Sequence, residues 1–316
     1  MKPHLFAAAV SVAVVTLSAA GAPAGAAANL QIGVRFQGRL RTYLLHVPPQ
    51  SGGALVLAFH GGGQTALEQQ TLGAFNAIAD RDGVLVAYPQ GIERSWADGR
   101  GTTKADRAGV DDVAFAKAVV EDVATRQPVD RARVYATGAS NGGIFVNRLA
   151  CDAADTFAAV APVIGTIASA LASRCHPSVP VPIVGIQGVS DPVVPFGGGE
   201  VGGTLDGAAA GGRVEGSRAT QELWRTLNGC AATVAATAMP TIVRDGTFVT
   251  RRAYGGCRAD VVWYEIAGGG HRWPMRRSER PMVERAVERL LGASSQNIDA
   301  TEVIWAFFAA HARGRA

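Results

Sequence analysis

The segment from Gly138 to Gly143 reads GASNGG and contains the pattern Gly-x-Ser-x-Gly, in which the serine can act as a nucleophile. Such a serine sits on a tight turn between a strand and a helix, because the flanking glycines leave room for the two elements to approach. The pattern also arises by chance in a chain with 39 glycines, where it would be a structural turn only. Here a branched strand is predicted at 133–137 and a helix at 141–150. We therefore predict that Ser140 attacks a carbonyl carbon.

A second glycine-rich segment, His60-Gly61-Gly62-Gly63, follows another predicted strand. Glycines there let backbone N–H groups approach the negative oxygen that develops during attack on a carbonyl, and one such donor is worth about 3 kcal/mol. We assign this oxyanion role to the N–H of Gly62, with the N–H of Asn141 as its partner; the neighbouring glycines are less favoured candidates. We expect the ring of His60 to hold the loop by hydrogen bonds rather than to act as a base.

A nucleophilic serine needs a base and an acid, which follow it in the chain order acid then base when the pattern lies on this kind of turn. Of the six histidines, His271 is the one in a loop directly after a late strand, within the glycine-rich segment 268–274. Asp191 lies between the serine and this histidine, just after a predicted strand at 183–186, and would orient the imidazole. Asp206, in a glycine-rich stretch, is the weaker candidate for the acid.

Short apolar runs that alternate with helical patterns must position these residues. Strands that are apolar throughout and separated by helices indicate a mostly parallel sheet covered on both faces, which is an α/β fold. Residues 197–216 are dominated by glycine and alanine and predict a mobile surface loop, and a capping box at Asp299 predicts a C-terminal helix. The strands are predicted at 43–47, 54–59, 84–88, 133–137, 158–163, 183–186 and 261–266; helical periodicity runs from Leu67 to Asp82 and from Val113 to Val123.

The chain of 316 residues, 48% apolar and 18% charged, is long enough for one large packed domain. A net charge of +4 with scattered arginines gives no indication of nucleic-acid binding. Residues 1–28 resemble a signal peptide: Lys2, an apolar run too short to span a membrane comfortably, and small residues up to Ala28. We expect a single catalytic domain at 29–316, secreted or periplasmic, without a membrane anchor and monomeric.

The cysteines are Cys151, Cys175, Cys230 and Cys257, all in the expected mature chain. An even number of cysteines in an exported protein indicates disulfides, and four cysteines allow three pairings. We favour Cys151–Cys175 and Cys230–Cys257, because each closes a loop of modest length, worth about 3 kcal/mol. Zinc binding is the alternative, but the close cysteine pairs that it needs are absent from this sequence.

The motifs HGGGQ, GASNGG, QGVSDPVVPF, GGGHRWP and SQNIDATEVIWAFFAAH occur in this order and together resemble one family. This is the poly(3-hydroxybutyrate) depolymerase-like and feruloyl esterase family of the α/β-hydrolase superfamily. The resemblance runs from about Leu55 to His311 and implies the same nucleophile, acid, base, oxyanion loop and disulfide pairing. Depolymerase-like members often carry cysteine at the third position of the oxyanion motif, where this chain has Gly62.

The expected reaction is carboxylic ester hydrolysis through an acyl-enzyme, with no metal or organic cofactor. Trp273 and Trp96 are candidates to wall the substrate site, although Trp96 could equally be a packed residue. Soluble short hydroxyalkanoate esters or oligomers fit best, since no appended module for solid polymer follows the domain; feruloyl or acetylxylan esters are the alternative. A peptidase on the same fold and a secreted binding protein without catalysis are the other hypotheses.

Overall fold

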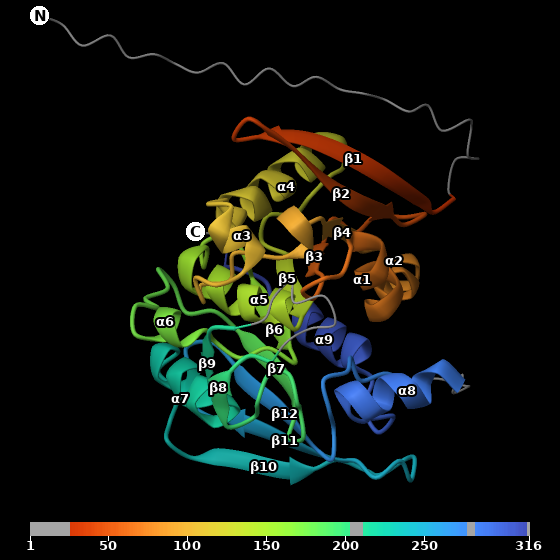
Figure 1. The fold of residues 1–316 in the computed structure, drawn as a ribbon. Coiled ribbons are helices and arrows are strands. Elements are labelled where there is room, and N and C mark those ends of the chain that lie inside the picture. Colours follow the sequence, from red (N-terminus) through yellow and green to blue (C-terminus); the bar gives the residue numbers. More distant parts are fainter. Residues whose placement is uncertain (1–25, 203–210, 277–281, 315–316) are drawn as a thin grey trace, which may run out of the picture.

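The computed structural model describes residues 26–202, 211–276 and 282–314. Within these residues a ten-stranded sheet runs through the molecule in the order β1-β2-β4-β3-β5-β6-β7-β12-β11-β10 (Figure 1). Its strands are β1 (Ala28–Phe36), β2 (Arg39–Val47), β3 (Leu55–Phe59), β4 (Leu85–Pro89), β5 (Val134–Ala139), β6 (Ala159–Val163), β7 (Ile183–Gly188), β10 (Val234–Ala238), β11 (Phe248–Tyr254) and β12 (Val261–Ala267).

Strands β4, β3, β5, β6, β7 and β12 are parallel neighbours, whereas β1, β2, β11 and β10 pair antiparallel at the two sides of the sheet. This mostly parallel arrangement confirms the predicted α/β fold. The helices are α1 (Ala66–Gly73), α2 (Phe75–Asp82), η1 (Ile92–Arg94), α3 (Lys104–Arg107), α4 (Asp112–Arg126), α5 (Asn141–Asp152), α6 (Ser169–Ala172), α7 (Ser217–Leu227), α8 (Met282–Leu291) and α9 (Ala300–Ala309).

Both faces of the parallel strands are buried, because successive side chains of a strand point to opposite faces. In β3, Leu55, Leu57 and Phe59 pack into the cluster that contains the apolar sides of α4 and α5. Val56 and Ala58 pack into the second cluster, with residues of α2 and α9. The fully apolar strands of the sequence therefore mark a sheet covered by helices on both sides.

The helical periodicity from Leu67 to Asp82 corresponds to two helices rather than one. Ala74 separates α1 from α2 and has a left-handed backbone, with φ at 49°. Its N–H donates to the carbonyl of Gln70, which ends α1, and the chain then turns directly into α2. Gly73 precedes the break, but the left-handed residue is the alanine after it, and the apolar pattern continues across both, so the periodicity did not reveal the break.

The glycine-rich stretch 197–216 is only in part the loop that we expected. Its ends pair as a small antiparallel sheet of β8 (Gly198–Glu200) and β9 (Arg213–Glu215). Val201 and Val214 are buried, so this stretch does contribute to the core. Residues 203–210, including the alternative acid Asp206, lie outside the described residues.

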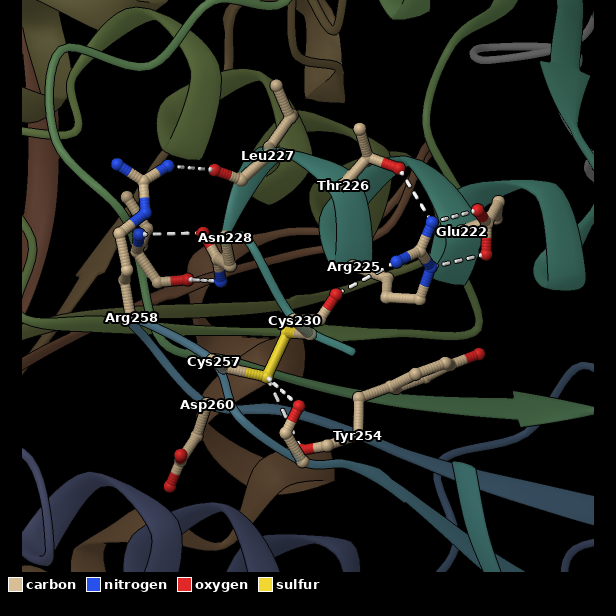
Figure 2. Close-up of a disulfide and its surroundings, with 12 residues drawn as sticks. Glu222, Arg225, Thr226, Leu227, Asn228, Cys230, Tyr254, Cys257, Arg258 and Asp260 are labelled. Atoms are coloured by element: carbon tan, nitrogen blue, oxygen red, sulfur yellow. Dashed lines mark hydrogen bonds and ion pairs between the residues drawn. A yellow bond between two sulfur atoms is a disulfide. The ribbon is translucent and has the colours of Figure 1, made fainter. Parts of the chain in front are cut away.

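The structure contains the two disulfides favoured above, Cys151–Cys175 and Cys230–Cys257. The first ties the C-terminal turn of α5 to the segment after α6. The second joins the loop after α7 to the turn that follows β11 (Figure 2). Beside it, Arg225 of α7 donates to the carbonyl oxygen of Cys230 at 2.9 Å. This hydrogen bond connects the end of the helix to the disulfide.

Residues 1–25, most of the expected signal peptide, lie outside the described residues. Among the helices of the described residues, none is long and apolar enough to cross a membrane. At the other end of the chain, Asp299 caps α9 and accepts hydrogen bonds from the N–H groups of Thr301 and Glu302, but the Glu302 side chain does not complete the predicted capping box within the described residues. The carboxylate of Glu302 pairs with Arg81, at 2.7 Å.

Candidate active site

Ser140 lies between the end of β5 and the start of α5, with a strained backbone at φ 56° and ψ −121°. The two glycines of its motif are required by close packing. A Cβ atom on Gly138 would lie 2.8 Å from the carbonyl oxygen of Phe59, and one on Gly142 would lie 2.4 Å from the same oxygen. The sequence thus forms a sharp turn that only glycine permits on either side of the serine.

The structure brings Ser140, His271 and Asp191 into one hydrogen-bonded row. The Nε2 atom of His271 lies 2.8 Å from Ser140 Oγ, and its Nδ1 atom lies 2.8 Å from Asp191 Oδ2. In the neutral tautomer with the proton on Nδ1, the ring donates to the carboxylate and accepts from the serine hydroxyl. The three residues are each less than a tenth exposed, so bulk water does not compete for these contacts.

Asp191 is held in place by its own loop. Its Oδ1 atom accepts the N–H groups of Val193 and Val194, both at 2.8 Å. Its Oδ2 atom accepts Gln187 Nε2 at 3.3 Å and faces His271. Because both oxygens are satisfied, the carboxylate has one orientation, and that orientation fixes the imidazole ring.

The loop that carries His271 is pinned by the segment after α8. The N–H of His271 donates to the carbonyl oxygen of Leu291 at 2.5 Å, and the N–H of Gly270 donates to Ala293 at 2.9 Å. A Cβ atom at Gly270 would lie 2.2 Å from Leu291 O, so the backbones pack here without room for a side chain. Close packing of the two backbones therefore requires glycine at this position of the loop.

The oxyanion loop offers a free N–H at the position that we predicted. In the described residues, Gly61 donates its N–H to Gln64 Oε1 at 3.0 Å and Gly63 donates to Arg94 O at 2.8 Å. The N–H of Gly62 has no such acceptor within the same residues, and Gly62 lines the cavity beside Ser140. The N–H of Asn141 belongs to the first turn of α5, where helical N–H groups have no helical acceptor.

His60 lies behind this loop and is fully buried. Its Nε2 atom accepts the N–H of Gly91 at 2.9 Å, which leaves Nδ1 to donate to the carbonyl oxygen of Gly61 at 2.8 Å. Burial lowers the pKa of His60 to about 4, so the ring is neutral at pH 7 and can make both contacts. His60 thus ties the oxyanion loop to the segment after β4.

The side chain of Asn141 is clamped by a buried segment after η1. Its Oδ1 atom accepts the N–H of Trp96 at 2.8 Å, and its Nδ2 atom donates to Asp98 Oδ2 at 2.6 Å. Asp98 is paired with Arg100 at 2.8 Å, and both side chains are fully buried. The segment therefore holds the first residue of α5 through its side chain, and the backbone N–H of Asn141 has no acceptor within the described residues.

Trp96 does not wall the substrate site, and that prediction is wrong. Its side chain is fully buried, donates from Nε1 to His60 O at 2.9 Å and stacks on Phe145 with ring centroids 5.4 Å apart. Trp96 packs behind the oxyanion loop because its indole N–H finds an acceptor there. Trp273 does line the cavity, while its Nε1 atom donates to Thr301 Oγ1 at 3.1 Å.

A cavity of about 480 Å³ lies over Ser140. Its lining includes apolar residues that the motifs did not indicate: Leu72, Ile164, Val193, Val287 and Leu291. Ile164, directly after β6, is left-handed with φ 46°, which is rare for a branched residue. Arg94 also lines the cavity and has φ 57°. Since these residues reach the site only through tertiary packing, no spacing in the sequence could reveal them.

Sequence comparison identifies the family. The profile of the family described as Esterase PHB depolymerase matches residues 41–195. The protein NocK of Nocardia uniformis subsp. tsuyamanensis, which is named as an esterase, is 33% identical over 281 residues, covering 83% of this chain and 79% of NocK. The chain belongs to this esterase family. This confirms the family resemblance that the motifs indicated, and the esterase is a carboxylic ester hydrolase.

Two further relatives show how far the likeness extends. Feruloyl esterase B of Piromyces equi is 31% identical over 157 residues, which are 47% of this chain and 27% of that protein. The solved structure of the acetyl xylan esterase from Aspergillus awamori superposes with a TM-score of 0.51 at 14% identity. The superposition covers 78% of the present chain and 93% of the Aspergillus chain. The second likeness concerns the fold, and it agrees with the α/β-hydrolase architecture described above.

Proposed function

We propose that this esterase is a secreted serine hydrolase of short hydroxyalkanoate esters or oligomers, with Ser140 as nucleophile, His271 as base and Asp191 as acid. The contact of 2.8 Å between His271 Nε2 and Ser140 Oγ is the observation that carries the proposal. A serine hydroxyl that donates to a neutral imidazole, itself oriented by a carboxylate, is arranged for attack on a carbonyl carbon.

The proposed reaction has two steps. His271 takes the proton of Ser140 as Oγ attacks the ester carbonyl, and the negative oxygen is stabilised by the N–H groups of Gly62 and Asn141. The imidazolium then gives its proton to the leaving alcohol, and an acyl-enzyme remains. Water, deprotonated by His271, attacks the acyl group, and collapse of the second tetrahedral intermediate releases the acid and restores Ser140.

A serine-to-alanine exchange tests the nucleophile. We expect Ser140→Ala to lower kcat for 4-nitrophenyl butyrate by about a million-fold with an unchanged Tm. The wild type should be labelled by a fluorophosphonate probe and the variant should not. Ser173→Ala, at an exposed serine after α6, is the matched control and should keep full activity. Substantial hydrolysis by Ser140→Ala would overturn the assignment, and an unlabelled, inactive wild type would favour a binding protein without catalysis.

Apolar side chains in the lining, such as Ile164, Val193 and Leu291, support a short acyl or alkyl group in the cavity. The Piromyces and Aspergillus relatives favour a second candidate, a feruloyl or acetylxylan esterase. Hydroxybutyrate oligomers, methyl ferulate and acetylated xylan, compared by kcat/KM, separate the two candidates. A 4-nitroanilide with the best acyl group should react far more slowly than the corresponding 4-nitrophenyl ester. Comparable rates would indicate a peptidase.

Secretion is part of the proposal, and the two disulfides together with the apolar run near Lys2 support it. Expression of the full chain in a bacterial host should release a protein shortened by about 28 residues into the periplasm or medium, measured by intact mass. An unprocessed chain retained in the cytoplasm would contradict this. We also propose a monomer, which sedimentation velocity measures directly.

A further inference from the structure

We propose that Arg94 forms a subsite for a carboxylate carried by the ester substrate. The inference rests on the proposed function and narrows it to acidic esters. It applies to half esters of dicarboxylic acids and to acyl esters of hydroxy acids, including the carboxyl end of a hydroxyalkanoate oligomer. Guanidinium groups suit this task because they bind a carboxylate through two parallel hydrogen bonds.

Three charged residues line the cavity over Ser140. They are Glu68, Arg94 and Arg272. The Glu68 carboxylate is already used, because its Oε2 atom accepts the N–H of Thr65 at 2.7 Å and the Thr65 hydroxyl at 2.8 Å in the capping box of α1. No ion pair joins Glu68 to either arginine within the described residues. The charge of Arg94 is therefore available to a ligand.

Arg94 is not among the arginines that form ion pairs within the described residues. Arg81, Arg131 and Arg225 each hold a carboxylate within 2.8 Å. Over the described part of the chain, the exposed Arg94 side chain has no acidic group within 4.0 Å. It lines the cavity, and its guanidinium forms no hydrogen bond or ion pair with another described residue.

The backbone of Arg94 is strained and firmly held. Glu93 and Arg94 both have left-handed φ values, 47° and 57°, and neither is glycine. Such conformations persist only where the surroundings impose them, and they concentrate at functional sites. Here the chain is anchored just before and just after this pair, by Gly91 N–H on His60 Nε2 at 2.9 Å and by Trp96 N–H on Asn141 Oδ1 at 2.8 Å.

The same segment links Arg94 to the oxyanion loop. The carbonyl oxygen of Arg94 accepts the N–H of Gly63 at 2.8 Å, and Gly62 directly precedes Gly63 in that loop. Arg94 therefore lies beside the oxyanion loop and lines the same cavity as Gly62. A substrate carboxylate that reaches the Arg94 guanidinium gains a charged partner, whereas the neutral methyl ester of the same substrate does not.

Two substrate pairs test the subsite, each an acid and its methyl ester. In the first pair, 4-nitrophenyl hydrogen glutarate carries the carboxylate on the acyl side of the ester. In the second pair, 3-acetoxybutyrate carries it on the alcohol side, and its hydrolysis is measured by the release of acetate. The variants are Arg94→Gln and Arg94→Lys. Arg35→Gln, at an exposed arginine of β1, and Arg272→Gln are the controls.

For at least one pair we expect Arg94→Gln to lower the acid-to-neutral ratio of kcat/KM about tenfold, mainly through KM, with partial retention in Arg94→Lys. The ratio in wild type should also fall in about 1 M NaCl, because screening weakens an exposed pair. Arg35→Gln should leave the ratio unchanged. Equal ratios in wild type and Arg94→Gln for both pairs would overturn the subsite, as would a loss confined to Arg272→Gln. A wild type that cleaves none of these esters refutes the proposed function instead.

Discussion

The Oδ2 atom of Asp98 lies 2.6 Å from Nδ2 of Asn141, so a buried carboxylate holds the residue next to the nucleophilic candidate. The same carboxylate binds the guanidinium of Arg100, whose Nη1 atom donates to the carbonyl oxygen of Gly211 at 2.8 Å. One buried ion pair thus connects the first turn of α5 with the glycine-rich stretch near β9. The Arg100 charge is compensated by Asp98 and not by water, so substitution of Asp98 would leave a buried charge unpaired.

Asp98→Asn should lower the free energy of unfolding by about 3 kcal/mol, because it leaves the buried Arg100 charge without its counter-ion. It should also lower kcat for a neutral ester by between about tenfold and a hundredfold with little change in KM, because the Asn141 N–H loses its fixed position. Urea unfolding and steady-state kinetics measure the two effects.

The matched control for this variant is Asp155→Asn, which removes the exposed pair of Asp155 with Lys117 at 3.1 Å. Exposed ion pairs contribute roughly 0–1 kcal/mol, so this control should be nearly neutral. Equal stability losses in the two variants would show that the Asp98 pair has no special role. A normal kcat in folded Asp98→Asn would separate Asp98 from the positioning of Asn141.

Asp191→Asn should lower kcat by about ten thousand-fold while the fold remains intact. The amide can still accept the N–H groups of Val193 and Val194, but it favours the wrong tautomer of His271. Near-UV circular dichroism checks the fold, and 4-nitrophenyl butyrate measures the rate. Activity within about tenfold of wild type would mean that another carboxylate orients the ring.

Stability should fall in acid because of His60. Its pKa is about 4 in the folded state and 6.5 when unperturbed, so between these values the unfolded chain binds the extra proton. The stabilisation is complete above pH 6.5 and is lost as the pH falls towards 4, by at most about 3 kcal/mol. Urea unfolding from pH 7 to pH 4 should show a shallower decline in His60→Gln. His176→Gln, at an exposed histidine, should keep the wild-type slope; identical slopes in all three proteins would exclude His60 as the cause.

The two disulfides should differ in their contribution to stability. They span separations of 24 and 27 residues, so the loss of loop constraint alone costs about 3 kcal/mol in each case. Cys151 and Cys175 are both buried, whereas Cys257 is only half-buried, so alanines at the first pair also leave a cavity. We expect the double alanine variant of the first pair to be the less stable in urea. The reverse order would contradict the burial argument.

The positions of Ser140, Asp191 and His271 could be predicted because strand-ending loops meet at one edge of a parallel sheet. Each of these residues follows a strand that is almost wholly buried and mostly apolar, and chain order then restricts the choice. The Gly62 N–H could be predicted for the same reason. The place of Trp96 could not be predicted. The sequence of a loop is the same whether its tryptophan ring faces a cavity or donates to a buried carbonyl oxygen such as that of His60.

Other parts of the fold had no signal in the sequence. Strand β10 is almost wholly exposed and consists of small residues, so it lacks the apolar run that marks an inner strand. The break at Ala74 depends on a left-handed alanine that no local pattern announces. Arg94 and Ile164 reach the cavity because the chain returns to the sheet edge from distant segments, and only the packed structure brings them together.

Laboratory evolution for heat tolerance will meet a conflict at Arg94, which like its neighbour Glu93 is exposed and left-handed. Glycine relieves a left-handed conformation, so at these two positions it would raise the Tm in a screen that rewards survival alone. The exchange at Arg94 also removes a charge from the cavity wall. A selection for protein that stays folded in heated lysates should therefore enrich variants with a higher Tm and a lower activity. A selection that also requires turnover should retain the native residues.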